Sequence, residues 1–283
     1  MSKYVFRRHS IWVCLKFHYN MKGEKMFKKS LLWAAGCLMV LAAAGSVNAQ
    51  PSKEITVSAA ISLKNAFEEI GKLFESQNAG TKIIFNFGAS GDLVKQIEGG
   101  APVDVFASAA QKDMDQIDTK GLIDGATRFN FVKNTVVLIQ SASSTLEIKG
   151  FEDLLKPEVK MISIGNPQTV PAGKYAQEVF THFKIWEGIS KKLVLAENVR
   201  QVLDYVTKNE VDAGMVYATD AAVQANKIKI VATAPSGSHS PIVYPVAMVK
   251  SSRKEAMAKA FITMLKSDEG MNILKKYGFE SAQ

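Results

Sequence analysis

The stretch Ile55-Thr56-Val57-Ser58-Ala59-Ala60-Ile61-Ser62-Leu63 decides the fold class, because it reads as a short buried strand that runs directly into a helix. Ser62 stands at the junction, so we expect it to cap the helix N-terminus. Where a strand ends at a helix start, free N–H groups converge and the helix dipole favours negative charge. The junction is therefore a candidate anion site. The apolar residues after it recur at helical spacing, at Leu63, Phe67, Ile70, Leu73 and Phe74.

Two further junctions of this kind follow along the chain. In Gly88-Ala89-Ser90-Gly91 the small residues let a ligand approach the backbone, and Ser90 can cap the helix or contact the ligand. Val170-Pro171-Ala172-Gly173 places a proline in the first turn of a helix, which leaves the amides of Ala172 and Gly173 free to point outward. Both are predicted to present N–H groups to the same kind of ligand.

A fourth junction and one tyrosine complete the set. In Glu197-Asn198-Val199-Arg200, Asn198 is predicted to cap a helix whose buried stripe begins at Val199. Arg200 is expected at the surface, solvated or in an ion pair. Tyr217 ends a predicted strand, which puts its phenol at the carboxyl edge of a sheet. Each feature alone is typical of ordinary capping or packing, and it is their repetition that indicates binding.

The order of the elements predicts an α/β protein, because strand-like and helix-like segments alternate almost throughout. The length suits one large sheet or two lobes, and ligands in such folds lie outside the carboxyl ends of the strands. Near Thr127–Phe131 the chain is expected to leave its first set of strands. Helices are predicted from about Gln111, near 173–184 and 199–208, and after Arg253, with strands at Lys82–Phe87, Val103–Ser108, Val136–Ile139, Met161–Ile164, Ala213–Tyr217, Ile228–Ala232 and Ile242–Val249.

Residues 1–49 read as a secretory signal peptide. A basic segment, Met26-Phe27-Lys28-Lys29, precedes an apolar run from Leu31 to Ala44 that is too short to span a membrane. The segment Gly45-Ser46-Val47-Asn48-Ala49 ends in the small-x-small pattern of a cleavage site. We therefore expect cleavage after Ala49 and a periplasmic protein.

Removing that segment changes the charge and the cysteine content. It holds eight Lys/Arg and one Asp/Glu, so the net charge falls from +8 to about +1, and a nucleic-acid or anionic-membrane partner is not supported. Both cysteines, Cys14 and Cys37, lie in it. We therefore expect the mature chain to have no disulfide and to be held together by its core alone.

The sequence favours a binding protein over an enzyme. Gly88-Ala89-Ser90 begins like a nucleophile elbow, but Asp92 occupies the place of its second glycine. The sequence contains no phosphate-binding glycine loop with a lysine and no Cys/His metal pattern. His182 and His239 stand far apart without metal-ligand partners, so both are interpreted as structural.

Six segments carry a family resemblance: Thr56–Leu63, Phe87–Leu93, Gly100–Phe106, Gly165–Tyr175, Glu197–Arg200 and Val216–Ala221. In this order they resemble the periplasmic molybdate-binding proteins of molybdate ABC transporters. The resemblance extends over essentially the whole mature chain, and the ending Lys276–Phe279 is similar too. Any one segment is a weak signal, whereas six in order are specific.

The resemblance implies a two-lobed α/β periplasmic-binding-protein fold, in which each lobe is a mainly parallel sheet flanked by helices and the ligand cleft lies between the lobes. We expect residues 50–131 and 235–283 to form one lobe and residues 132–234 the other. No catalytic residue and no cofactor is implied, and molybdenum is bound only as molybdate. The implied contacts are hydroxyl and backbone donors of Ser62 and Ser90, backbone N–H groups of Ala172 and Val199, and the phenol of Tyr217.

The function implied by the resemblance is capture of molybdate, and of the similar tungstate, for delivery to the membrane permease of an ABC transporter by a monomer. Another tetrahedral oxyanion, sulfate or phosphate, is an open alternative. So are the effector domain of a transcription regulator and an exported hydrolase, although no nucleophile has a visible base. Asp92, two residues after Ser90, either faces solvent near the helix dipole or changes the ligand.

Overall fold

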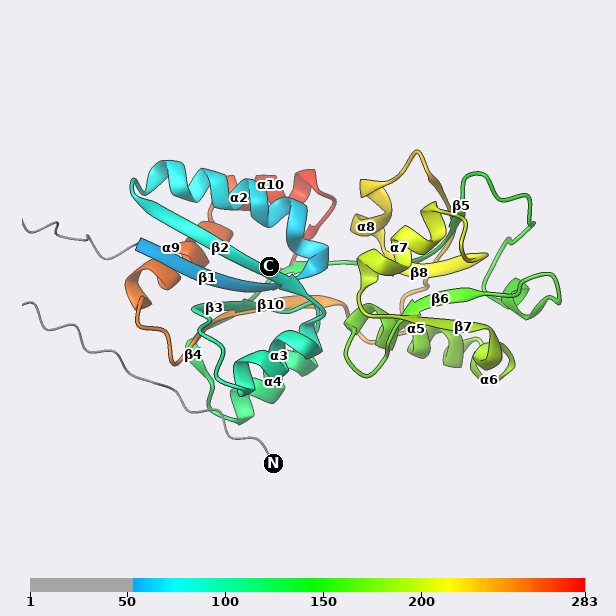
Figure 1. The fold of residues 1–283 in the computed structure, drawn as a ribbon, viewed down its shortest axis with the longest axis horizontal. Helices are drawn as coiled ribbons and strands as arrows, with labels where there is room; N and C mark the ends of the chain where they lie inside the picture. The colour runs from blue at the N-terminus through cyan, green and yellow to red at the C-terminus, as the bar shows by residue number, and fades with distance from the viewer. Residues whose placement is uncertain (1–52, 283) are drawn as a thin grey trace, which may run out of the picture. The chain divides into compact units, whose positions relative to one another are not determined.

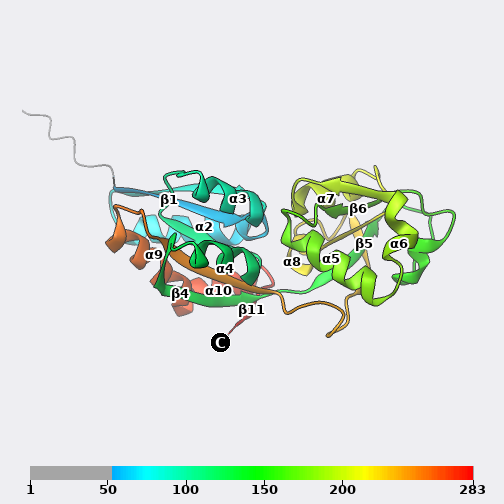
Figure 2. The ribbon, with the colours of Figure 1, turned by 90° about the horizontal axis from the view of Figure 1, so that it is seen from below.

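The computed structural model describes residues 53–282, and residues 51–283 form one compact unit. Two sheets, each with helices on both faces, form two lobes (Figure 1, Figure 2). The predicted signal peptide and both cysteines lie outside the described residues. In the part of the chain that is described, no helix is long and apolar enough to cross a membrane.

The first lobe is built on a six-stranded sheet in the order β11-β4-β10-β3-β1-β2. Strands β1 to β4 run one way, and β10 and the short β11 run the other. Helices α2, α9 and α10 cover one face and α3 and α4 the other (Figure 1). The bounds are β1 Lys53–Ala60, η1 Ile61–Leu63, α2 Lys64–Gln77, β2 Thr81–Gly88, α3 Ser90–Glu98, β3 Val105–Ala107, α4 Gln111–Thr119, β4 Ile123–Lys133, β10 Val243–Val249, α9 Glu255–Lys266, α10 Asp268–Lys276 and β11 Glu280–Ser281.

The second lobe is built on a five-stranded sheet in the order β7-β6-β8-β5-β9, in which only β5 opposes the other strands. Helices α5 and α6 lie on one face and α7 and α8 on the other (Figure 1). The predicted α/β fold with helices flanking each sheet is confirmed, but the sheets are mixed rather than mainly parallel, since four of the nine strand pairings among the described residues are parallel and five are antiparallel. The bounds are β5 Val136–Ser141, η2 Glu152–Leu155, β6 Ile162–Gly165, α5 Pro171–His182, α6 Trp186–Ile189, η3 Ser190–Lys192, β7 Leu193–Ala196, α7 Val199–Thr207, β8 Ala213–Tyr217, α8 Ala218–Val223 and β9 Ile228–Thr233.

The chain changes sheet twice, at Asn134–Thr135 between β4 and β5 and through residues 234–242 between β9 and β10. The predicted departure from the first sheet at Thr127–Phe131 is wrong, because β4 continues through it to Lys133. Pairing with β10 and β11 holds this polar segment in the sheet. The predicted lobe boundaries, 50–131 with 235–283 and 132–234, stay a prediction.

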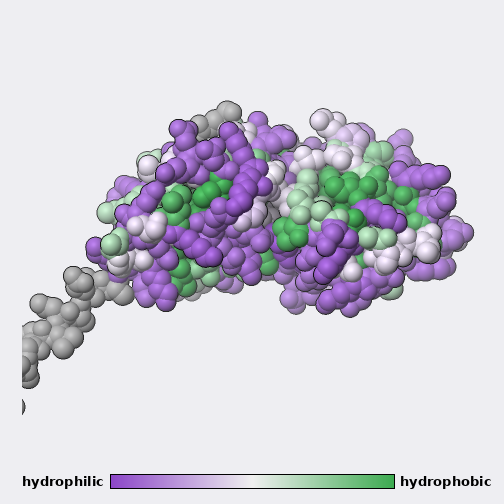
Figure 3. All heavy atoms as spheres, turned by 90° about the horizontal axis from the view of Figure 1, so that it is seen from above, coloured by the Kyte–Doolittle hydropathy of each residue, from purple (hydrophilic) through white to green (hydrophobic). Residues whose placement is uncertain are grey.

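Apolar side chains between the sheets and their helices form the core. In the first lobe, Phe67 of α2 packs against Phe85, Phe131 and Phe261, with ring centroids 5.9 to 6.2 Å apart. In the second, one helical stripe of α7 is buried against the sheet, as its spacing predicts. On the face drawn in Figure 3, hydrophilic residues predominate and hydrophobic ones are gathered in small areas.

Candidate anion-binding site

The five residues predicted to bind the ligand meet at one small cavity. Ser62, Ser90, Ala172, Val199 and Tyr217 all line it, although they come from η1, α3, α5, α7 and β8. The space inside it is small, about 200 Å³ even when the part open to solvent is included. The cavity therefore suits a small ion. Its other lining residues are Ala60, Ile61, Gly88, Ala89, Ala109, Val170 and Pro171.

The cavity lies where parallel strands of both sheets end and the next helices begin. Strands β1 and β2 end at it, at Ala60 and Gly88, and β8 ends at Tyr217. The helix starts of α3, α5 and α7 also reach it, so their N-terminal dipoles point toward one place from both lobes. This is the position at which open α/β sheets bind ligands.

Two of the predicted helix starts are confirmed, and one is wrong. Asn198 caps α7, since its side chain accepts a hydrogen bond from the Gln201 amide at 3.1 Å, and Pro171 is the first residue of α5. Ser62 is not an N-cap. A 3₁₀ turn precedes α2, so Ser62 lies inside that turn and its hydroxyl lies 3.0 Å from the Tyr244 hydroxyl instead.

Backbone amides supply donors without side-chain charge. Ser90 and Val199 are the first residues of their helices and Ala172 is a second residue, so none has an intrahelical acceptor for its N–H. The predicted free amide of Gly173 is wrong, because it donates to the Val170 carbonyl at 3.0 Å. Three amides therefore remain as donors at the cavity wall.

The Ser90 hydroxyl is oriented by the backbone. Its Oγ is fully buried and accepts the amide hydrogen of Ala109 at 3.0 Å. An amide nitrogen can only donate, so the hydroxyl hydrogen of Ser90 is left for another acceptor. Because Ser90 lines the cavity, that hydrogen is available to a ligand there.

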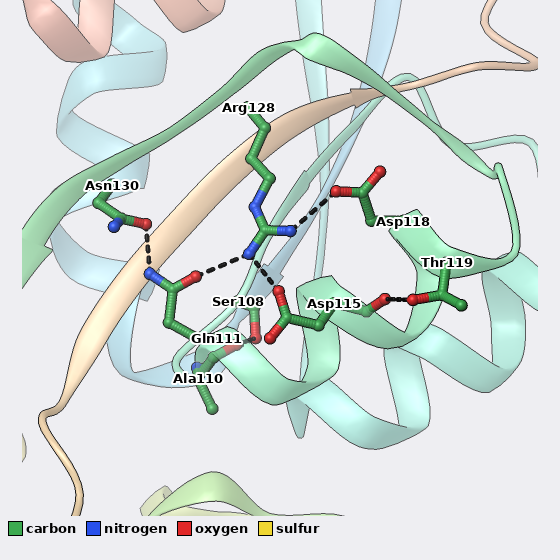
Figure 4. Close-up of polar contacts among 8 residues, drawn as sticks. All are labelled: Ser108, Ala110, Gln111, Asp115, Asp118, Thr119, Arg128 and Asn130. Carbon is green, nitrogen blue, oxygen red and sulfur yellow. Dashed lines mark hydrogen bonds and ion pairs between the residues drawn. The ribbon is translucent and has the colours of Figure 1, made fainter.

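A polar cluster between α4 and β4 lies next to the turn that carries Ala109 (Figure 4). Arg128 of β4 donates to Asp118 and to Gln111 at 2.8 Å, and pairs with Asp115. In the adjoining turn, the Ser108 hydroxyl donates to the Ala110 carbonyl at 2.9 Å. The start of α4 is thereby fastened to the sheet, which fixes the amide that orients Ser90.

Tyr217 is the clearest sign of a missing partner. Its side chain is 1% exposed, and its hydroxyl has no hydrogen-bond partner among residues 53–282. Buried polar groups are nearly always paired, so an orphan at a cavity wall points to a ligand. Burial raises the pKa of the Tyr217 phenol well above its ordinary value, so the hydroxyl keeps its hydrogen and acts as a donor.

None of the residues that line the cavity is charged. Arg200, next to Val199, forms an ion pair with the fully buried Asp220, so it is ion-paired as predicted but only 17% exposed. Burial raises the pKa of the Asp220 carboxyl, and Arg200 opposes that rise. The Asp92 side chain is 45% exposed and pairs with Lys95 at 3.0 Å, in keeping with its solvent-facing interpretation.

Metal chemistry finds no support among the described residues, where no group of three or more His, Cys, Asp or Glu side chains could hold an ion. His239 has its Nδ1 2.8 Å from the Ser240 carbonyl, and His182 packs edge-on against Phe183. Both histidines thus have local structural contacts.

Sequence reasoning missed two residues behind the cavity, Tyr244 and Asn134. The Tyr244 hydroxyl lies 3.0 Å from Ser62 Oγ, and Asn134 Nδ2 donates to that hydroxyl at 3.2 Å. No local signal marks them, since Tyr244 stands 182 positions from Ser62. For Asn134 the only hint in the sequence is its place in the polar pair Asn134-Thr135, directly before the apolar run of β5.

The chain matches one family model and several known relatives. The family described as "Bacterial extracellular solute-binding protein" matches residues 55–280. The molybdate-binding protein ModA of Escherichia coli K12 is 39% identical over 90% of this chain and 99% of its own.

Two solved structures are similar. The substrate-binding domain of a putative molybdenum ABC transporter from Clostridium difficile has 40% identity and a TM-score of 0.63 over 81% of this chain and 99% of its own. The periplasmic molybdate-binding protein of Azotobacter vinelandii has 26% identity and a TM-score of 0.73 over 81% of this chain and 100% of its own. These are solute-binding proteins and not enzymes, and the chain belongs to the family of bacterial extracellular solute-binding proteins.

Proposed function

We propose that this protein captures molybdate, and tungstate with it, and delivers the anion to the permease of an ABC transporter. The observation that carries the proposal is the small cavity lined by uncharged donors from both lobes. Relatives that match nearly the full chain are named for molybdate binding, which supports the choice of ligand.

The donor set fits an oxyanion that carries no proton. The hydroxyls of Ser62, Ser90 and Tyr217 and the amides of Ala172 and Val199 can place hydrogens on several oxygens at once. Helix N-termini add favourable potential without a mobile counter-charge. Numerous fixed neutral donors thus replace the water shell of the dianion without a lysine or arginine in the wall.

Selectivity follows from size and from donor polarity. Hydrogen phosphate carries a proton that needs an acceptor, and a wall made only of donors leaves that proton unpaired. Sulfate carries no proton but is smaller than molybdate, so it would contact fewer of the fixed donors at their best distances. Tungstate has nearly the size and charge of molybdate and should bind comparably.

The two lobes supply the transport signal in this proposal. An anion held by donors from both lobes favours the closed arrangement, and the permease would recognise that arrangement. The signal peptide over residues 1–49, the periplasmic location and the monomeric state belong to the same proposal.

Calorimetric titration of the chain from Gln50 onward, with molybdate, tungstate, sulfate and phosphate separately, tests the proposal. We expect one-to-one binding of molybdate and tungstate and no detectable heat with sulfate or phosphate. Ser62→Ala should weaken molybdate about 10- to 100-fold, as for the loss of a hydrogen bond to a charged group. Ser163→Ala is the matched control, because Ser163 is buried in the second lobe away from the cavity.

Two results would redirect the assignment. Preferential binding of sulfate or phosphate would keep the transport role and change the solute, with Asp92 the first residue to examine. No detectable binding of any of the four anions would refute oxyanion binding altogether.

A further inference from the structure

A chain of hydrogen bonds leads from the cavity to the segment that joins the lobes. Ser62 Oγ lies 3.0 Å from the Tyr244 hydroxyl, and Asn134 Nδ2 donates to that hydroxyl at 3.2 Å. The same Nδ2 donates to Thr219 Oγ1 at 2.8 Å. Tyr244 is fully buried, and Ser62 and Thr219 are 4% and 3% exposed, so water does not compete freely for these contacts.

The backbone fixes which way the Asn134 amide points. Asn134 Oδ1 accepts the amide hydrogen of Thr135 at 2.9 Å. A backbone N–H can only donate, so the oxygen has to face it and the NH₂ group has to face Tyr244 and Thr219. A flipped amide would set two donors against each other. Both hydrogens of Nδ2 are thus engaged.

This orientation decides the direction of the next bond. The Tyr244 hydroxyl accepts from Asn134, and it has one hydrogen of its own to give. Burial raises the pKa of the Tyr244 phenol, so that hydrogen stays in place. The Tyr217 ring packs against Tyr244, but its hydroxyl makes no hydrogen bond of ordinary length among the described residues, whereas Ser62 Oγ lies 3.0 Å from the Tyr244 hydroxyl. We therefore assign Ser62 Oγ as the acceptor of the Tyr244 hydrogen.

The bond between Tyr244 and Ser62 determines whether Ser62 presents a hydrogen or a lone pair to the cavity. Because Ser62 Oγ accepts from Tyr244, its own hydrogen is directed elsewhere, and Ser62 lines the cavity. Ser90 is arranged in the same way by the amide of Ala109. Each serine hydroxyl therefore faces the ligand as a donor, one set by the backbone and the other by a relay of side chains.

We infer that Asn134 and Tyr244 are positioning residues that determine specificity, since they lock Ser62 as a hydrogen-bond donor and so select an oxyanion without a proton. The inference rests on the proposed function, because it needs an anion in the cavity. It goes beyond that function by assigning the polarity of the site to two residues that do not line it.

Asn134→Asp is the informative substitution, because it replaces the NH₂ group by an acceptor of the same shape. Tyr244 then gives its hydrogen to Asp, Ser62 gives its hydrogen to Tyr244, and lone pairs face the ligand. We expect molybdate affinity to fall about 10- to 100-fold. The molybdate-to-phosphate ratio, with phosphate affinity read from its competition with molybdate at high phosphate concentration, should fall at least as far.

The added negative charge also repels the dianion, so the substitution is repeated in a Tyr244→Phe background, where the relay is cut but the charge remains. There Asn134→Asp should weaken binding clearly less than it does in the presence of Tyr244, because only the repulsion remains. Tyr244→Phe alone should cost only about 2- to 10-fold, the value of a neutral hydrogen bond. Equal losses from Asn134→Asp in both backgrounds would show repulsion alone and would overturn the inference.

Thr219→Val is the matched control, because it removes the other hydrogen bond of the same amide and leaves the relay intact. The molybdate-to-phosphate ratio should stay unchanged, and a fall equal to that of Asn134→Asp would overturn the inference. Thermal unfolding without ligand shows which variants fold.

Should Asn134→Asp fail to fold, Tyr244→Phe in a Ser62→Ala background gives a second test. With no hydroxyl to orient, Tyr244→Phe should have no further effect, and additive losses would contradict the relay. Titration of the wild-type protein tests the proposed function alone, since it asks only whether molybdate binds. If the wild type binds molybdate but the variants do not behave as expected, the relay is wrong and the proposed function stands.

Discussion

Gly91 brings the backbones of the two lobes into contact beside the cavity. Its amide, in the first turn of α3, donates to the Thr169 carbonyl in the loop before α5 at 3.0 Å. A Cβ added at Gly91 would lie 2.8 Å from that oxygen and 3.0 Å from the Thr169 Cα. These are backbone atoms, so no rotamer change relieves the overlap. Gly91→Ala therefore has to move the two lobes apart at this point.

The expected effect combines two contributions. Losing the interlobe hydrogen bond costs about 0.5 to 1.5 kcal/mol, and overpacking at a tight contact costs about 1 to 3 kcal/mol. If the anion binds only when the lobes approach this closely, both contributions oppose binding. Together they amount to about 1.5 to 4.5 kcal/mol, which weakens molybdate binding about 10- to 2000-fold.

Calorimetric titration of Gly91→Ala with molybdate measures this effect, and thermal unfolding without anion shows whether the lobes fold normally. Gly125→Ala is the matched control, because that glycine is exposed on β4 of the same lobe and an added Cβ meets only Asp118 Oδ1, at 3.7 Å. A folded Gly91→Ala protein that binds as tightly as the control would refute the reasoning that the observed contact belongs to the binding-competent arrangement.

Three further outcomes are expected. Tyr217→Phe should weaken molybdate about 10- to 100-fold while the unfolding temperature without anion stays the same or rises, because the hydroxyl has no partner among the described residues; lower stability with unchanged affinity would contradict this. Burial raises the pKa of Asp113 from 3.8 to about 6, so its contribution to stability is full below 3.8 and is lost as pH rises through 6. In urea unfolding, the free energy of unfolding of Asp113→Asn should therefore exceed that of the wild type by at most about 3 kcal/mol at high pH and by little at pH 4. An equal increase at both pH values would rule out titration as the cause. Asp220→Asn leaves Arg200 without its buried counter-charge and should cost about 3 to 5 kcal/mol, most of it regained in Arg200→Met/Asp220→Leu; a single variant as stable as wild type would disprove the importance of the pair.

The parts of the site that depend on local sequence were predictable. Pro171 and Asn198 start their helices where their backbone and capping chemistry predicts. Tyr217 ends its strand as its apolar run predicts. Pro171 pointed to the amide of Ala172 and Asn198 to the helix start at Val199, and the family resemblance implied both residues as ligand contacts; both line the cavity.

The parts that depend on distant contacts were not predictable. Ser62 was predicted to cap a helix, but its hydroxyl lies at hydrogen-bond distance from the hydroxyl of Tyr244 on β10. The sequence predicted that the chain leaves the first sheet at Thr127–Phe131, because the polar residues there give no clear strand pattern. The segment is a strand because it pairs with β10. Asn134 and Tyr244 have no local pattern, since each acts through a residue at least 110 positions away.

The place of β10 in the first sheet has a consequence for how the chain is assembled during synthesis. β10 lies between β3 and β4, yet it follows the whole second lobe in the sequence. The strands of the second lobe can pair as soon as β9 has been made, whereas β4 cannot join β3 until Val243–Val249 arrives. The second lobe is thus free to fold first, as a unit. A chain that stops before Val243 would lack both the strand that joins β3 to β4 and the tyrosine that meets Ser62.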